Sequence, residues 1–187
     1  MKRMLQSVMA AGALLVLGGA PLAAQAIVGS PIRFGITGGA TFPVGNLSDV
    51  AKTGWNAGAL LDIGLPLVPI GFRVDGTWQQ LGNKTVAGEE IKNRIIAGTV
   101  DATYTFGSML PTKFYLIGGV GLYNLKTDVN TGVGSATDKE TKFGVNAGAG
   151  LRFQLTGFST FVEARWHDIF TKGSSTQMVP VSVGITF

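Results

Sequence analysis

Apolar and polar residues alternate with a period of two along most of the chain after residue 26. This alternation predicts β-strands, because successive side chains of a strand point to opposite faces. Eight runs show it, at residues 32–42, 55–65, 70–79, 96–106, 114–125, 142–153, 162–167 and 179–187. The phase of the fifth run is ambiguous, and we expect Phe114, Leu116, Val120 and Leu122 on its apolar face. No stretch in this region has the roughly 18 to 20 consecutive apolar residues that a membrane-spanning helix needs.

The two faces of these runs differ in an unusual way. None of their charged residues lies on the apolar face, and all of them lie on the opposite face, which is rich in glycine. A soluble β-sandwich needs many Lys and Glu residues on its outer side, whereas a barrel in lipid is apolar outside and polar inside. An open sheet edge in hydrocarbon would leave backbone groups unpaired, so such a sheet must close. The pattern therefore predicts an all-β fold, an eight-stranded antiparallel up-and-down transmembrane β-barrel.

The links between the runs alternate between long and short. The long links are residues 44–53, 82–93, 127–140 and 168–177, and the short links are residues 66–69, 107–112 and 155–158. Outer-membrane barrels have short periplasmic turns and longer external loops, so we expect both termini in the periplasm. Aromatic residues at the strand ends predict a girdle at each membrane interface. Those toward the long links are Phe42, Trp55, Trp78, Tyr123, Phe143 and Trp166, and those toward the short links are Phe72, Tyr104, Phe106, Phe114, Phe153 and Phe187.

The first 26 residues have the anatomy of a secretory signal peptide. Lys2 and Arg3 form a positive start, residues 5–17 are mostly apolar, and Ala24-Gln25-Ala26 supplies a cleavage site. We therefore divide the chain into a signal peptide at residues 1–26 and a barrel domain at residues 27–187. Removal of Lys2 and Arg3 lowers the formal charge from +4 to +2. No basic cluster with interleaved aromatics is found, so we expect no nucleic-acid partner.

Composition narrows the function classes further. Charged residues make up only 14% of the chain, against roughly 25% in soluble domains, which speaks against an ordinary soluble enzyme. The chain has no Cys, which excludes disulfides, thiolate metal sites and cysteine nucleophiles.

The charges that we expect inside the barrel balance one another. Four Arg residues face four carboxylates there: Arg33, Arg73, Arg152 and Arg165, with Asp62, Asp75, Asp101 and Glu163. The rigid guanidinium fork suits pairing with carboxylates where little water enters. A symmetric turn at residues 66–69 places Asp62 opposite Arg73, and we expect an ion pair of about 4 Å or less there. Together with His167, these residues form the predicted ion-pair network of the lumen. A barrel of about eight strands encloses just enough space for side chains to fill, so we expect a filled lumen.

The C-terminal pattern Val179-x-Val181-x-Val183-x-Ile185-x-Phe187, the predicted signal peptide and the eight amphipathic strands resemble the small outer-membrane β-barrel domain family. That family includes OmpX and the transmembrane part of OmpA, and the resemblance covers the whole mature chain. It implies that Val183, Ile185 and Phe187 act as a signal for the barrel-assembly machinery. It also implies a monomer in contact with outer-membrane lipid and lipopolysaccharide. Pro180 departs mildly from the pattern, since proline removes one ladder donor.

Candidate catalytic residues are few. His167 is the single His, and barrels that resemble the lipid A deacylase need a Ser two residues later, where this chain has Ile169. The chain also offers too few clustered His and carboxylate residues for a metal site, and we expect no cofactor and no enzyme activity. Three hypotheses follow: a non-enzymatic membrane scaffold whose loops meet the outside, a narrow channel for ions or small solutes, and a soluble lipocalin-type barrel. The last requires an apolar interior, which the inward charges oppose.

Overall fold

The computed structural model describes residues 32–65, 67–86, 89–106, 112–131, 134–171 and 174–187. The predicted signal peptide lies outside these residues. The elements, in chain order, are β1 (Ile32–Val44), α2 (Leu47–Val50), β2 (Lys52–Gly64), β3 (Ile70–Gly82), β4 (Lys84–Val86), β5 (Glu89–Phe106), β6 (Thr112–Thr131), β7 (Gly134–Gln154), β8 (Ser159–Thr171) and β9 (Ser174–Thr186). Within the described residues, no helix combines the length and the hydropathy that a membrane crossing would require.

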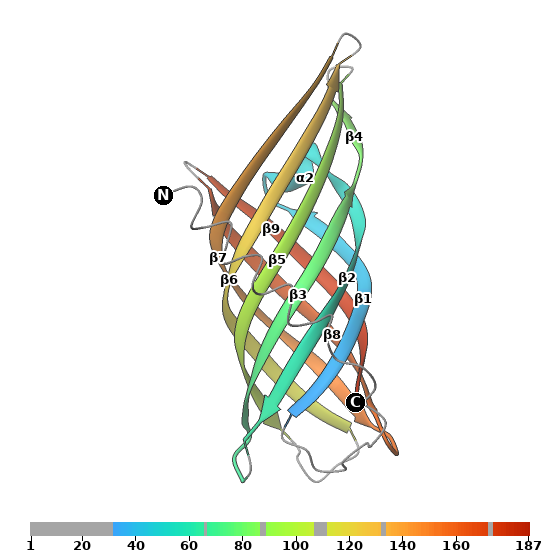
Figure 1. Cartoon of the computed structure of the whole chain (residues 1–187), viewed down its shortest axis with the longest axis vertical. Coiled ribbons are helices and arrows are strands. Elements are labelled where there is room, and N and C mark those ends of the chain that lie inside the picture. Colours follow the sequence, from blue (N-terminus) through green and yellow to red (C-terminus); the bar gives the residue numbers. More distant parts are fainter. Residues whose placement is uncertain (1–31, 66, 87–88, 107–111, 132–133, 172–173) are drawn as a thin grey trace, which may run out of the picture.

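The strands form one closed antiparallel barrel, shown in Figure 1. Neighbours in the sheet follow the order β3-β2-β1-β9-β8-β7-β6-β5-β4, and a further pairing of β3 with β5 closes the circle. The predicted eight-stranded up-and-down barrel is confirmed. The short strand β4 was not predicted; it follows β3 and pairs with the first residues of β5.

The two faces of the sheet separate as the alternation predicts. Large apolar side chains point outward along the strands, for example Phe34, which is 66% exposed, and Val183, which is 55% exposed. The predicted outward phase of β6 is confirmed, because Phe114, Leu116, Val120 and Leu122 are all exposed. The predicted register of the β2–β3 hairpin is confirmed too, since Asp62 pairs with Arg73 in the ladder. Apolar residues outside and charges inside are the arrangement that lipid selects.

Three of the four predicted long links are largely strand, which corrects the sequence-based boundaries. β5, β6 and β7 have 18, 20 and 21 residues, whereas β1 has only 13. The pairing of β6 with β7 runs without a break from Thr112 and Phe153 to Thr131 and Gly134. In Figure 1 these strands rise well beyond the rest of the barrel. Their outer parts are polar on both faces, so they lack the alternation by which we recognised the membrane-spanning parts.

An apolar cluster fills the lumen at the end where α2 lies. It consists of Leu47, Ala51, Leu81, Ile95, Ala97, Tyr123, Ile169 and Met178. Leu47 belongs to α2, and the backbone carbonyls of α2 accept hydrogen bonds from Lys84 Nζ at Ser48 (2.9 Å) and from Asn93 Nδ2 at Val50 (3.4 Å). The placement of Tyr123 in the aromatic girdle was wrong. Its side chain is fully buried in the lumen, because it has the same parity along β6 as the inward-facing Tyr115 and Ile117.

Candidate functional site in the barrel lumen

All nine residues of the predicted ion-pair network lie on the inner face of the barrel. Eight of them are buried: Asp62, Arg73, Asp75, Asp101, Arg152, Glu163, Arg165 and His167. The ninth, Arg33, is half-buried near the start of β1. They come from strands spread around the whole circumference, so the fold gathers in one place charges that lie far apart in the sequence.

Arg73 on β3 is the first centre of this network, and its side chain is completely buried. Its Nε atom lies 2.6 Å from Asp62 Oδ1, and Nη2 lies 3.4 Å from Asp62 Oδ2. Its Nη1 atom reaches across the lumen to Glu163 Oε2 on β8, at 2.7 Å. The guanidinium carbon lies 5.4 Å from the ring centre of Tyr115 and 5.2 Å from that of Phe161. Two carboxylates and two aromatic faces therefore replace the water that this cation loses on burial.

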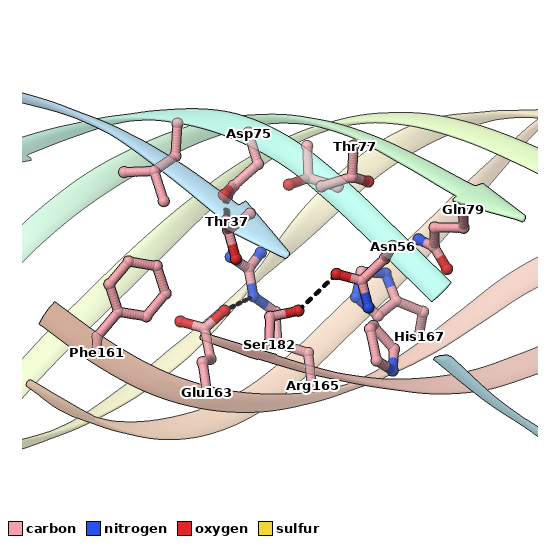
Figure 2. A pocket seen from close by; sticks show the side chains of 13 residues that line it. Thr37, Asn56, Asp75, Thr77, Gln79, Phe161, Glu163, Arg165, His167 and Ser182 are labelled. Carbon is pink, nitrogen blue, oxygen red and sulfur yellow. Dashed lines mark hydrogen bonds and ion pairs between the residues drawn. The ribbon is translucent and has the colours of Figure 1, made fainter. Parts of the chain in front are cut away.

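Arg165 on β8 is the second centre. Its Nε atom donates to Glu163 Oε1, its Nη1 lies 3.0 Å from Asp101 Oδ2, and its Nη2 lies 3.1 Å from both oxygens of Asp75. Figure 2 shows Arg165 between Glu163 and Asp75, with the carboxylates converging on one guanidinium group. Asn146 Nδ2 also donates to Asp101, at 2.7 Å. Because every donor nitrogen of the guanidinium fork points at a carboxylate, Lys could not take this place.

The two centres form one continuous chain of ion pairs. Glu163 joins Arg73 to Arg165, and Asp62 joins Arg73 to Arg152 on β7. Most of these contacts connect strands that are not neighbours in the sheet, such as β3 with β8 and β2 with β7. Replacing a buried network by apolar residues is often tolerated, but removing one partner leaves an uncompensated charge and costs about 3 to 5 kcal/mol. The network therefore holds opposite walls of the barrel in a fixed relation.

His167 lies just beyond Arg165 on β8 and faces Tyr123. Its Nδ1 atom is 2.8 Å from the Tyr123 hydroxyl. Ile169, which stands where a deacylase-like barrel needs Ser, is buried in the apolar cluster. Among the described residues, no group of three His, Cys, Asp or Glu side chains could hold a metal ion. The described contacts of His167 therefore differ from those of a deacylase-like barrel, because an apolar residue stands at the position of the required Ser.

Two aromatic residues of the lumen, Tyr115 and Phe161, are not among the predicted site residues. Tyr115 and Phe161 are 2% and 1% exposed, and the Tyr115 hydroxyl donates to Glu163 Oε2 at 2.6 Å. Glycines make room for these rings: a Cβ atom on Gly150 would overlap with the Tyr115 ring, and one on Gly184 would overlap with the Phe161 ring. The strand parity of both aromatics points inward, so a strict reading of the alternation could have found them.

Cavities remain between the described side chains of the lumen. One holds about 30 Å³ beside Arg165 and His167, and the labelled side chains of Figure 2 line it. Another holds about 200 Å³ at the end of the short β2–β3 turn. Its lining includes Arg33, Lys113 and Arg152. Lys113 is a further inward cation that lies outside the predicted runs, because the alternation of the fifth run begins at Phe114.

The predicted girdle and assembly residues lie on the outer face. Phe42, Trp55, Trp78, Tyr104, Phe106 and Trp166 are each 39% to 53% exposed. Val183, Ile185 and Phe187 are 55%, 37% and 60% exposed. These side chains are therefore available to lipid and to other proteins, and they take no part in the ion-pair network.

Comparison with known proteins agrees with this geometry. A profile of the outer membrane protein beta-barrel domain matches residues 12–187. The fold is similar to Neisserial surface protein A (NspA), with a TM-score of 0.62 and 17% identity over 84% of this chain and 96% of that one. It is also similar to a major outer membrane protein of Thermus thermophilus, with a TM-score of 0.59 and 13% identity over 83% of this chain and 98% of that one.

A third structure, the N-terminal β-barrel domain of Pseudomonas aeruginosa OprF, has a TM-score of 0.51 and 17% identity over 84% of this chain and 98% of that one. At these identities the likeness is one of fold alone. No curated protein matches the chain in sequence. The profile match over nearly the whole chain, with the lipid-facing apolar surface and the charged lumen, shows that the protein belongs to the outer membrane protein β-barrel domain family.

Proposed function

We propose that the protein is a non-enzymatic, non-conducting scaffold of the outer membrane, whose barrel holds a polar sheet above the membrane for contact with surface partners. The observation that carries this proposal is the length of β5, β6 and β7. About 9 to 11 tilted residues suffice for a strand to cross a bilayer. The 20 and 21 residues of β6 and β7 thus extend about 10 residues, or roughly 30 Å of strand, beyond that need.

The outer part of the β6–β7 hairpin, called the projecting hairpin below, is polar and exposed to water. Asp138, Lys139 and Glu140 are exposed. Lys126 pairs with Asp128 at 2.9 Å, and Lys142 Nζ lies 3.0 Å from Glu140 Oε2. The pairing of β7 with β8 begins only at Gly144, so the described residues of β7 before it have one unpaired edge. Such an edge can pair with another chain, and charged side chains along it oppose non-specific pairing.

The filled lumen argues against a channel. At one end the apolar cluster under α2 occupies the interior, and in the middle the buried ion pairs of Arg73 and Arg165 cross it. The two cavities described above share no lining residue. A lipocalin-type function has even less support, because an apolar ligand would have to enter an interior occupied by charges.

The outward apolar surface supports contact with outer-membrane lipid, including lipopolysaccharide on the outer leaflet. We place the projecting hairpin outside the cell and both termini in the periplasm, since short turns face the periplasm in this class of barrel. Export by a cleaved signal peptide, recognition of the C-terminal residues by the barrel-assembly machinery and a monomeric state belong to the same proposal.

Cysteine labelling in intact cells tests this arrangement, because the chain has no Cys of its own. K139C places a thiol on the projecting hairpin, and V68C places one in the short β2–β3 turn as the matched control. A membrane-impermeant maleimide should label K139C in intact cells and V68C only after the outer membrane is opened. Labelling of V68C alone would reverse the proposed orientation.

Planar-bilayer recordings test the closed lumen. The purified protein should give no sustained conductance. Steady single-channel currents that are abolished by a bulky substitution in the lumen would establish the channel in place of the scaffold.

A further inference from the structure

The larger of the two cavities has a marked excess of positive charge. Arg33, Lys113 and Arg152 line it, and Asp62 is the one carboxylate among its described lining residues. That carboxylate is already occupied, because it accepts hydrogen bonds from both Arg73 and Arg152. The inward charges as a whole are nearly balanced, but the balance is not local: the carboxylates gather around Arg165, whereas the excess cations gather at this end.

The cations of this cavity also have unused hydrogen-bond donors. The Nε atoms of Arg33 and Arg152 are buried and have no partner among the described residues. The side chain of Arg152 is only 9% exposed, and its Nη2 atom is bound to Asp62. Its Nε–H group is therefore shielded from solvent but has no acceptor in the described part of the chain. Neither Arg33 nor Lys113 forms an ion pair with a described carboxylate. A buried donor that is left unsatisfied costs about 1 to 3 kcal/mol, and more for a charged group, so this arrangement favours a further acceptor.

The space and the chemistry of the cavity define that acceptor. Its volume is about 200 Å³, against the ~10–15 Å³ that a single water needs. Thr103 and Thr105 also line it, and their hydroxyls can donate or accept. Guanidinium and ammonium groups bind oxyanions through short, charge-assisted hydrogen bonds.

We propose that this cavity is a binding site for a phosphate-type oxyanion, held by Arg33, Lys113 and Arg152 at the short-turn end of the barrel. The anion would offset the local positive charge and accept from the unpartnered Nε–H groups. A free phosphate and the headgroup of an anionic phospholipid share this chemistry. The site lies at the opposite end from the projecting hairpin. A test of anion binding is therefore independent of a test of the proposed surface function.

Titration with inorganic phosphate, followed by NMR of the arginine Nε–H groups, tests the site directly. The full chain is folded into nanodiscs of phosphatidylcholine, and the phosphate is added at constant ionic strength. The Nε–H signals of Arg33 and Arg152 should shift together and saturate with one dissociation constant, whereas Arg94, which stacks on Trp78 at 4.7 Å, should not respond. An absence of saturable shifts, both here and with the anionic lipid described below, would overturn the proposal.

Variants identify the residues that bind. R33Q and K113Q should each weaken phosphate binding, read from the Arg152 signal, by about tenfold or more, the equivalent of about 1.4 kcal/mol. K139Q removes the same charge from the exposed hairpin and should bind as the unchanged protein does. Heat-modifiability on a gel shows that each variant is folded. Two folded variants with unaltered phosphate affinity would contradict the assignment.

A second set of nanodiscs containing phosphatidylglycerol distinguishes the two sources of the anion. If the headgroup occupies the site, the lipid alone shifts both Nε–H signals and added phosphate changes them no further. If the occupant is a free anion, the lipid leaves them unmoved and phosphate shifts them as before. Either result supports the oxyanion site, and signals that respond to neither probe would refute it.

Discussion

Removal of the Arg73 guanidinium should destabilise the barrel more than the loss of any surface charge. The structure allows the cost of R73Q to be worked out. Two hydrogen bonds of 2.6 and 2.7 Å to Asp62 and Glu163 are lost, and bonds to charged groups contribute about 1.5 to 3 kcal/mol each. Both carboxylates keep another cation, Arg152 for Asp62 and Arg165 for Glu163. We therefore expect a loss of about 3 to 4 kcal/mol, in the lower part of the range for broken buried pairs.

The assay is reversible unfolding in urea of the protein folded into lipid vesicles, followed by the fluorescence of its three Trp residues and by gel mobility. K139Q, which removes an exposed charge, is the control and should lie within about 0.5 kcal/mol of the unchanged protein. In a double-mutant cycle, R73Q and E163Q should be strongly non-additive, because each removes the partner of the other. An R73Q protein as stable as the control would refute the view that the network holds the walls together. So would free-energy changes of R73Q and E163Q that simply add in the double variant.

Three further predictions concern the faces of the barrel. G150A places a Cβ in steric overlap with the Tyr115 ring and should cost about 1 to 3 kcal/mol in urea unfolding, whereas G98A, which meets nothing within 4 Å, should be nearly neutral. V100R puts a charge on the lipid-facing side, where Val100 is 56% exposed; it should cost about 2 to 4 kcal/mol in vesicles, and an unchanged midpoint would argue against burial in lipid. Deletion of Phe187 should lower the yield of folded protein in cells while refolding into vesicles stays nearly unchanged; equal losses in both would assign Phe187 a structural role only.

The alternation along the chain was sufficient to predict the barrel and which face of each strand points outward, and one short turn added a ladder register. These features follow from local rules, since a strand exposes alternate residues and lipid tolerates only apolar ones on its side. The Asp62 and Arg73 pair could be predicted because a short turn fixes which residues face each other. The predicted lengths of β5, β6 and β7 were wrong, because strands that leave the membrane no longer need an apolar face.

The sequence by itself thus determined which residues face lipid and which face the axis. Only the closed barrel decided which inward residues meet. Glu163 on β8 meets Arg73 on β3 because closure brings opposite walls together, and Tyr123 contacts His167 because their strands flank β7 on its two sides. The same closure separates the cations of Arg33, Lys113 and Arg152 from the carboxylates around Arg165. A count of charges cannot show this separation, since Coulomb interactions depend on distances that the tertiary structure alone sets.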